Sequence, residues 1–180
     1  MAMIGFNTST NTGDYTLFNE GVTVFTLEGI HIKVATEFEA PYDPYPAATL
    51  VWVDPEGDKF YDSFVKVPIG LKLNDKAKWT KRLGALVGRP LKDDDVSKLG
   101  IDFGDDISNY DQLFEAVKAG RTVEVLALEF EGQSLFGRQA QLNLTVTQDG
   151  KWNRCAAGDA TPMPRAGGGK TRPGAVGAPI

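Results

Sequence analysis

The chain has almost none of the residues from which nucleophilic and metal sites are most often built. Its 180 residues include one cysteine, Cys155, and one histidine, His31. A single cysteine excludes an intrachain disulfide, and a Cys/His zinc site needs three or four ligands. The composition allows one Cys–His pair, that of Cys155 with His31, and the two residues are expected on different strands. We therefore expect no enzyme, no cofactor and no metal site.

Long apolar runs are missing as well. No stretch approaches the ~20 apolar residues that a membrane helix needs. Residues 1–13 lack the basic and apolar regions of a signal peptide. We expect a single soluble domain with no membrane contact, located in the cytoplasm, or in the host cytoplasm if a phage encodes it.

Positive charge is scarce overall but locally concentrated. The chain has 19 Lys and Arg against 24 Asp and Glu, a net charge of −5. Five of the cations lie in residues 76–89, and we expect a basic helix face that meets either water or phosphates, formed by Lys76, Lys78, Lys81 and Arg82. Seven aspartates lie in residues 91–111, and residues 91–107 are expected to be a solvated acidic loop.

Alternation of apolar and polar residues predicts a mainly β chain. The first strand is expected to be long and bent at Gly29. Helices are expected from Asn74 to Val87 and from a Ser108 cap to Gly120. Asp149-Gly150 predicts a two-residue hairpin. The strands are expected at residues 21–38, 49–53, 59–67, 122–130, 139–147 and 151–157.

The strongest strand signal is residues 48–67, which predict a hairpin closed by the turn at residues 54–58. Two interpretations of its aromatic residues stay open, a base-stacking surface or a packed core. In the second strand of this hairpin, residues 59–67, regular alternation predicts two faces. Phe60, Phe64 and Lys66 lie on one face, and Tyr61, Val65 and Val67 lie on the other.

This order of elements matches a five-stranded OB-like Greek-key barrel with one or two helices between strands 3 and 4. A β-sandwich with helical decoration is the main competing fold. We expect an irregular lead-in at residues 1–20 and the barrel domain at residues 21–157. Residues 158–180, rich in Gly and Pro, are expected to be a flexible tail.

Four segments resemble a known family: EGVTVFTLEGI (residues 20–30), LVWVDPEGDKFYDSFVKV (50–67), WTKRLGALVGRPL (79–91) and FGRQAQLNLTVTQDGKWNRCAA (136–157). The helix segment and the last strand pair are the most specific of them. Together they make the chain similar to phage-encoded OB-fold single-stranded DNA-binding proteins of replication and recombination modules. The resemblance implies non-enzymatic binding of single-stranded DNA, with other replication proteins as partners and a homo-oligomeric state.

Candidate binding residues are aromatics that stack on bases and cations that hold phosphates. An alternative for residues 151–154 is an edge strand kept soluble by its charges. Two other functions stay open, a phage structural or assembly protein whose tail packs on a neighbour, and an acidic inhibitor of a host DNA-binding protein. The candidates are Tyr42, Trp52, Phe60, Tyr61, Lys66, Arg138, Lys151, Trp152 and Arg154.

Overall fold

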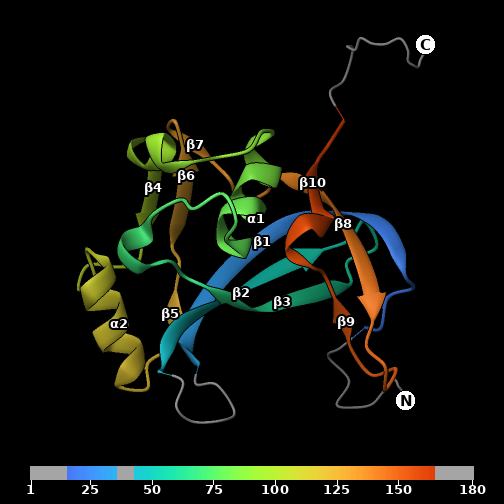
Figure 1. The fold of residues 1–180 in the computed structure, drawn as a ribbon, viewed down its shortest axis with the longest axis horizontal. Coiled ribbons are helices and arrows are strands. Elements are labelled where there is room, and N and C mark those ends of the chain that lie inside the picture. Colours follow the sequence, from blue (N-terminus) through green and yellow to red (C-terminus); the bar gives the residue numbers. More distant parts are fainter. Residues whose placement is uncertain (1–15, 36–42, 165–180) are drawn as a thin grey trace.

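The computed structural model describes residues 16–35 and 43–164, which form a mainly β fold (Figure 1). This part of the chain contains ten strands, two α-helices and three short 3-10 helices. The predicted mainly β class and the helix after the third strand are confirmed, whereas a count of five strands is too low. Among the described residues, no helix is long and apolar enough to cross a membrane.

The larger sheet is antiparallel and runs in the order β10-β8-β1-β2-β3, with β5 beside β1 and β9 beside β8. Figure 1 shows it strongly curled, in the shape of a half-barrel. Its long strand, β1 (Gly21–Ala35), pairs first with β8 and then with β2, and a register shift after Leu27 bends it beside Gly29 as predicted. The other strands are β2 (Tyr45–Val53), β3 (Lys59–Lys66), β5 (Val123–Glu124), β8 (Gln139–Val146), β9 (Asn153–Arg154) and β10 (Ala160–Pro162).

A second, three-stranded sheet divides the strand that was expected at residues 122–130. The Val125 N–H donates to the Ile30 carbonyl of β1 at 3.0 Å, and the next N–H, that of Leu126, donates to the Asp102 carbonyl at 2.8 Å. The segment is apolar on both sides because it passes from one sheet to the other. The second sheet has the order β4-β6-β7, formed by β4 (Leu99–Asp102), β6 (Ala127–Phe130) and β7 (Gln133–Ser134).

The acidic segment at residues 91–107 is not the solvated loop that we expected. It contains η2 (Asp93–Lys98) and β4, and Asp95 is buried. The Asp95 carboxylate lies 2.9 Å from Arg89 Nη2 and 3.4 Å from Lys98 Nζ. The Arg89 guanidinium holds the pKa of Asp95 well below its usual range. An internal ion pair therefore orders this segment.

Both helices begin later than predicted. Asn74 accepts a hydrogen bond from the Lys76 N–H in a separate turn, so α1 (Lys78–Val87) begins after Ala77. The N-cap of α2 (Tyr110–Lys118) is Asn109 rather than Ser108, and its side chain accepts from the Gln112 N–H at 2.9 Å. The connector η1 (Ile69–Leu71) precedes α1.

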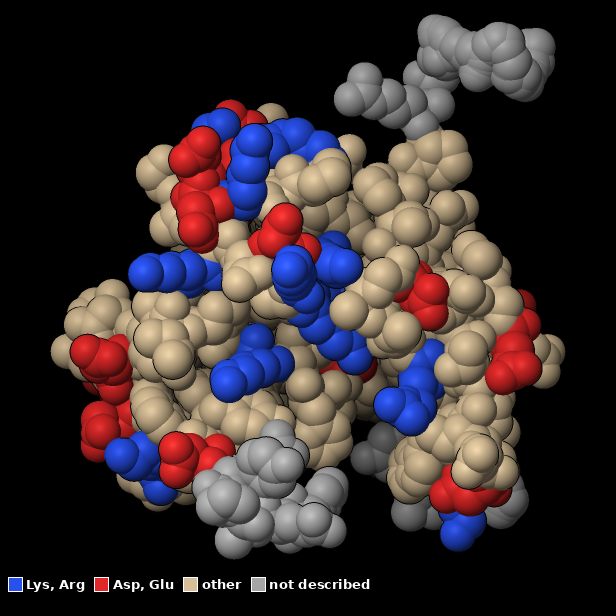
Figure 2. Space-filling model, viewed as in Figure 1, with Lys and Arg blue, Asp and Glu red and all other residues tan. Residues whose placement is uncertain are grey.

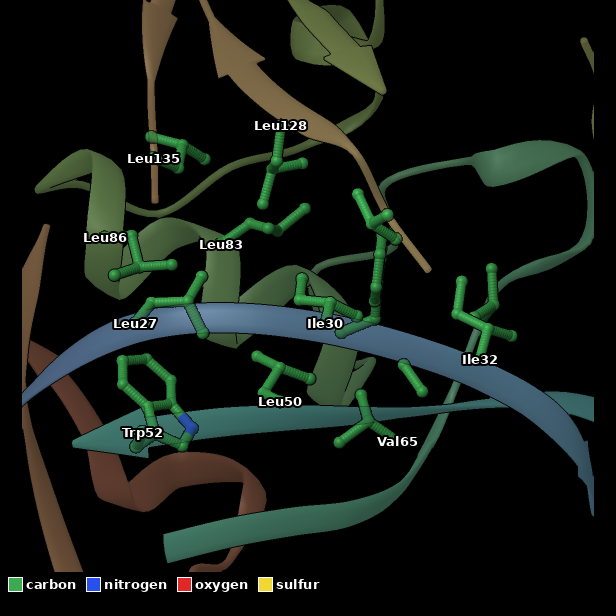
Figure 3. Packing of buried hydrophobic residues seen from close by; sticks show 14 of the residues in the cluster. Leu27, Ile30, Ile32, Leu50, Trp52, Val65, Leu83, Leu86, Leu128 and Leu135 are labelled. Carbon is green, nitrogen blue, oxygen red and sulfur yellow. The ribbon is translucent and has the colours of Figure 1, made fainter. Parts of the chain in front are cut away.

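One hydrophobic core joins the two sheets and the two helices. Figure 3 shows Leu83 and Leu86 of α1 on one side of β1, with Leu50 and Trp52 of β2 on the other. These four side chains are almost fully buried. Helix α1 also contacts β3, β8 and β10, so it fills the open inner side of the curled sheet.

The chain stays ordered beyond the point where a flexible tail was expected. After the short strand β9 it forms η3 (Ala157–Asp159), and β10 then pairs with β8, with Ala160 opposite Leu142. The predicted start of the tail at residue 158 is therefore wrong. Residues 165–180 and most of the predicted lead-in, residues 1–15, lie outside the described residues.

Arg82 was expected on the polar face of its helix but is completely buried. Its Nε atom donates to Asp62 Oδ2 on β3 at 2.6 Å. Its Nη atoms donate to backbone carbonyls that follow β9, those of Cys155 at 2.7 Å, Ala156 at 3.2 Å and Ala157 at 3.3 Å. One guanidinium thus joins β3 to the segment that leads into β10, and these two strands end the strand order of the sheet.

Replacing Arg82 by Met should lower the free energy of unfolding by about 3–5 kcal/mol, because the Asp62 carboxylate then stays buried without its strongest partner. The double variant Asp62→Leu/Arg82→Met should lose less, since the one charge left without its partner, on Lys78, is not fully buried. Urea unfolding followed by tryptophan fluorescence measures both. Equal losses in the two variants would show that packing, and not the ion pair, accounts for the effect.

Candidate functional site

Two of the predicted binding residues, Trp52 and Phe60, belong to the core. Trp52 is 0% exposed, and its indole N–H donates to the Asp62 carboxylate at 3.4 Å. Phe60 lies opposite Trp52 in the ladder, and its ring centroid is 6.0 Å from that of Phe25. Their assignment to a binding surface is wrong, because a stacked base needs an open ring face.

A bulge in β3 reverses the predicted faces of the hairpin. One residue of β2 lies opposite two residues of β3, Ser63 and Phe64. The extra residue shifts the alternation of inward and outward side chains by one position. Phe60 and Val65 therefore both face the core although they are five positions apart. The prediction that Phe60, Phe64 and Lys66 share one face is wrong for this reason.

Phe64 is the most unusual residue of this bulge. Its φ of 61° lies in the left-handed region, which costs a residue other than glycine about 1–3 kcal/mol. Its side chain is 64% exposed. Next to it, the Thr49 hydroxyl donates to the Ser63 hydroxyl at 3.4 Å. Because an exposed aromatic on strained backbone does not stabilise the core, Phe64 marks a candidate functional site.

The outer side of β1, β2 and β3 forms a surface around Phe64, which we call the outer face. Ala47 lies between Lys33 and Lys66 in the ladder, so two cations flank a small residue. At Gly29, no atom lies within 4 Å of the position that a Cβ would take. Small side chains therefore alternate with lysines and aromatics. The outer face comprises Gly29, His31, Lys33, Ala47, Thr49, Val51, Tyr61, Phe64 and Lys66.

The edges of the outer face are partly engaged in local contacts. Lys66 Nζ lies 5.3 Å from the centre of the Tyr45 ring, within the range of a cation–π contact. Lys59, at the other end of β3, forms a 3.0 Å ion pair with Glu28. Tyr61 is half-buried, and Tyr42 lies outside the described residues. Of the predicted residues on this hairpin, Tyr61 and Lys66 remain accessible.

The other predicted cations lie apart from this hairpin, Arg138 beside Leu27 of β1 and Lys151 and Arg154 at β9. Arg138 already has partners, since its Nη2 donates to Gln133 Oε1 at 2.7 Å. Arg154 is exposed opposite Thr145, and Trp152 is 52% exposed beside exposed Lys151. The hairpin before β9 is longer than predicted, because the Thr147 N–H donates to the Trp152 carbonyl across the turn.

The structure does not bring these two groups of residues together. Along β1, Val22 lies opposite Asn143 of β8, whereas Lys33 lies opposite Ala47 of β2. Eleven positions of extended strand separate Val22 from Lys33, about 35 Å before the bend is considered. The outer face is therefore a site by itself, distinct from the β8–β9 hairpin with Lys151, Trp152 and Arg154.

Cys155 and His31 lie on opposite sides of the sheet. Cys155 is buried beside Arg82, and burial raises the pKa of its thiol to about 11. His31 lies between Thr49 and Glu124 in the ladder, on the outer face. They form no nucleophilic pair. Within residues 16–35 and 43–164, no group of three or more His, Cys, Asp or Glu side chains is arranged to hold a metal.

The candidate binding residues predicted from sequence leave out Lys33 and Phe64, although Phe64 belongs to the aromatics of residues 48–67 that were considered for base stacking. For Lys33 the signal was present, because the alternation of β1 places it on the face opposite Ile32. For Phe64 no local signal existed, since Phe is rarely found at positive φ. Only pairing with β2 makes the bulge visible.

Two substitutions at Phe64 test the strain. Phe64→Ala and Phe64→Gly both remove the ring, but only glycine adopts a φ near 61° without steric cost. We expect the glycine variant to be more stable than the alanine variant by about 1 kcal/mol. Thermal unfolding measures the difference, and a more stable alanine variant would contradict a left-handed Phe64.

The raised pKa of Cys155 predicts a pH dependence of stability. Because the unfolded thiol ionises at lower pH than the folded thiol, this group stabilises the fold below about pH 9 and loses that effect as pH rises towards 11. We expect the wild type to lose more stability than Cys155→Ala between these values. Urea unfolding at several pH values measures this, and parallel curves for the two proteins would contradict it.

Comparisons with known proteins do not identify a function for the outer face. No protein-family model, no curated protein and no solved structure matches the chain. The resemblance to phage single-stranded DNA-binding proteins therefore stays a prediction from sequence. What the outer face can bind follows from its own chemistry, that of exposed aromatic rings and lysines on a sheet.

Proposed function

We propose that the protein binds single-stranded DNA on the outer face, without chemistry on the strand and without strong sequence preference. The observation that carries this proposal is Phe64, an exposed ring on strained backbone close to Lys66. A sheet that presents aromatics beside cations is the arrangement with which single-strand binders hold bases and phosphates. Action in phage DNA replication or recombination is part of the proposal and rests on the sequence resemblance.

The proposed mechanism divides the work between rings and lysines. Bases stack on Phe64 and on the accessible part of Tyr61, each stacked base contributing about 1–3 kcal/mol. Lys33 and Lys66 hold phosphates on either side of Ala47. The open space above Gly29 leaves room for the backbone of the strand. Because lysine contacts release counterions, affinity falls as salt rises.

Unpaired bases are the preferred ligand for two reasons. Stacking on a protein ring requires a base whose face is not already covered by a neighbour in a duplex. The net charge of −5 also weakens non-specific attraction to the dense charge of double-stranded DNA. A small basic and aromatic area on an acidic protein therefore favours single strands.

An OB-type barrel is the arrangement that we infer for this sheet. Its support is the bent first strand, which pairs with β2 along one half and with β8 along the other. The position of α1 between β3 and β8 in the chain also agrees with this fold. In OB folds the ligand lies on strands 2 and 3, which correspond to β2 and β3 of the outer face. One difference is the unpaired side of β3, which ends the sheet.

Titration of fluorescent oligo-dT by anisotropy at low salt tests the proposal. We expect Phe64→Ala to weaken binding by about 1–3 kcal/mol, the contribution of one stacked base. Lys66→Gln should weaken binding less and reduce the salt dependence by about one unit of log–log slope.

Val22→Ala is the matched control, because Val22 is 64% exposed, like Phe64, and lies opposite Asn143 of β8, away from the outer face. It should bind oligo-dT like the wild type. Thermal unfolding of each variant separates loss of binding from loss of fold. Absence of wild-type binding at low salt, or equal losses in Phe64→Ala and Val22→Ala, would reject the proposal.

A further inference from the structure

A second basic surface lies beside the outer face, on helix α1. Figure 2 shows lysine and arginine side chains gathered over α1 in the middle of this view, with acidic side chains beside them and more towards the margins. The helix contributes Lys78 and Lys81 to this surface, since its third cation, Arg82, is buried. The surface is local, because the chain as a whole carries a net charge of −5.

The two lysines occupy the end of the helix where cations are least favourable. The first turn of α1 holds Lys78 and Lys81 and no acidic residue, and the N-cap Ala77 makes no side-chain cap. A helix N-terminus carries a partial positive charge from its free N–H groups, so these cations oppose the helix dipole. An anion at this place would relieve the repulsion and accept hydrogen bonds from the free N–H groups.

A polar group in the same turn is also left without a partner. Thr80 is 1% exposed, and among the described residues its Oγ1 atom has no hydrogen-bond partner. The first turn of α1 thus combines an uncapped end, two lysines and an unsatisfied hydroxyl. The first turn of α1 thus departs from two usual preferences at a helix N-terminus, that for acidic residues and that for a capping side chain. Such departures are expected at a functional site rather than at a purely structural one.

This turn lies next to β3, the strand that carries Phe64. Lys78 Nζ is 3.3 Å from Asp62 Oδ1, which places the ammonium group against β3. Phe64 follows Asp62 by two positions, at most about 7 Å along the strand. Because β3 ends the strand order of its sheet, no further strand within residues 16–35 and 43–164 separates the outer face from α1 on this side.

We propose that a DNA strand bound on the outer face continues over the unpaired edge of β3 and lays its phosphates against the first turn of α1, where Lys78 and Lys81 hold them. This inference rests on the proposed function and extends its site. It assigns the basic helix face to a bound phosphate backbone instead of to water alone. It also implies that the full site holds more nucleotides than the outer face accommodates.

The test compares two lengths of oligo-dT, about 4 and about 12 nucleotides, which span much of the range of site sizes known for one OB fold. Binding is measured by anisotropy at several salt concentrations, for the wild type, Lys81→Gln and Lys78→Gln/Lys81→Gln. Lys118→Gln on α2 is the control, because it removes one exposed charge from a different helix. Thermal unfolding checks that each variant is folded, and Lys81→Gln alone decides if the double variant is not.

We expect the short oligonucleotide to bind all four proteins equally. The long oligonucleotide should bind the double variant about tenfold more weakly, with a log–log salt slope reduced by about 1 for each lysine removed. If both lengths bind the double variant like the wild type, the path over α1 is wrong while the outer-face site stands. If the wild type binds neither length, the proposed function fails and this inference fails with it.

Discussion

The buried ion pair between Arg82 and Asp62 is the interaction on which the architecture depends. A guanidinium with no exposure to water is tolerated only when its donors are satisfied, and here a carboxylate and three carbonyls satisfy them. These partners come from β3 and from the segment after β9, which are far apart in sequence. Arg82 therefore joins α1 to β3 and to the segment that leads into β10, the two strands at the ends of the strand order.

The same strand that supplies this anchor also presents the candidate site. Asp62 points into the core and Phe64 points out of it, although regular alternation would place both on one face. The bulge between them makes both orientations possible, at the cost of a left-handed phenylalanine. The buried ion pair of Asp62 and the exposed Phe64 are thus only two positions apart. The ion pair holds in place the strand that carries the strained residue.

Charge is distributed so that a net acidic protein can present basic surfaces. The Asp95 carboxylate is neutralised locally by Arg89 and Lys98, and Asp106 by Arg121. Lysines on the outer face and on α1 are less fully matched, since of the described acids only Asp62 forms an ion pair with one of them, Lys78. The local charge of each surface, and not the net charge of −5, determines which ligands that surface attracts.

Much of the fold follows from sequence alone. Alternation places β1, β2, β3 and β8, and the apolar spacing of both helices is correct, because these signals depend only on neighbouring residues. The second sheet, the buried Arg82 and the bulge at Phe64 depend on partners that lie distant in the chain. An arginine among lysines has the pattern of a solvent-facing residue until Asp62 is placed beside it. An aromatic strand likewise predicts rings on a surface or in a core, and only the register with β2 decides that Trp52 and Phe60 are inside and Phe64 is outside.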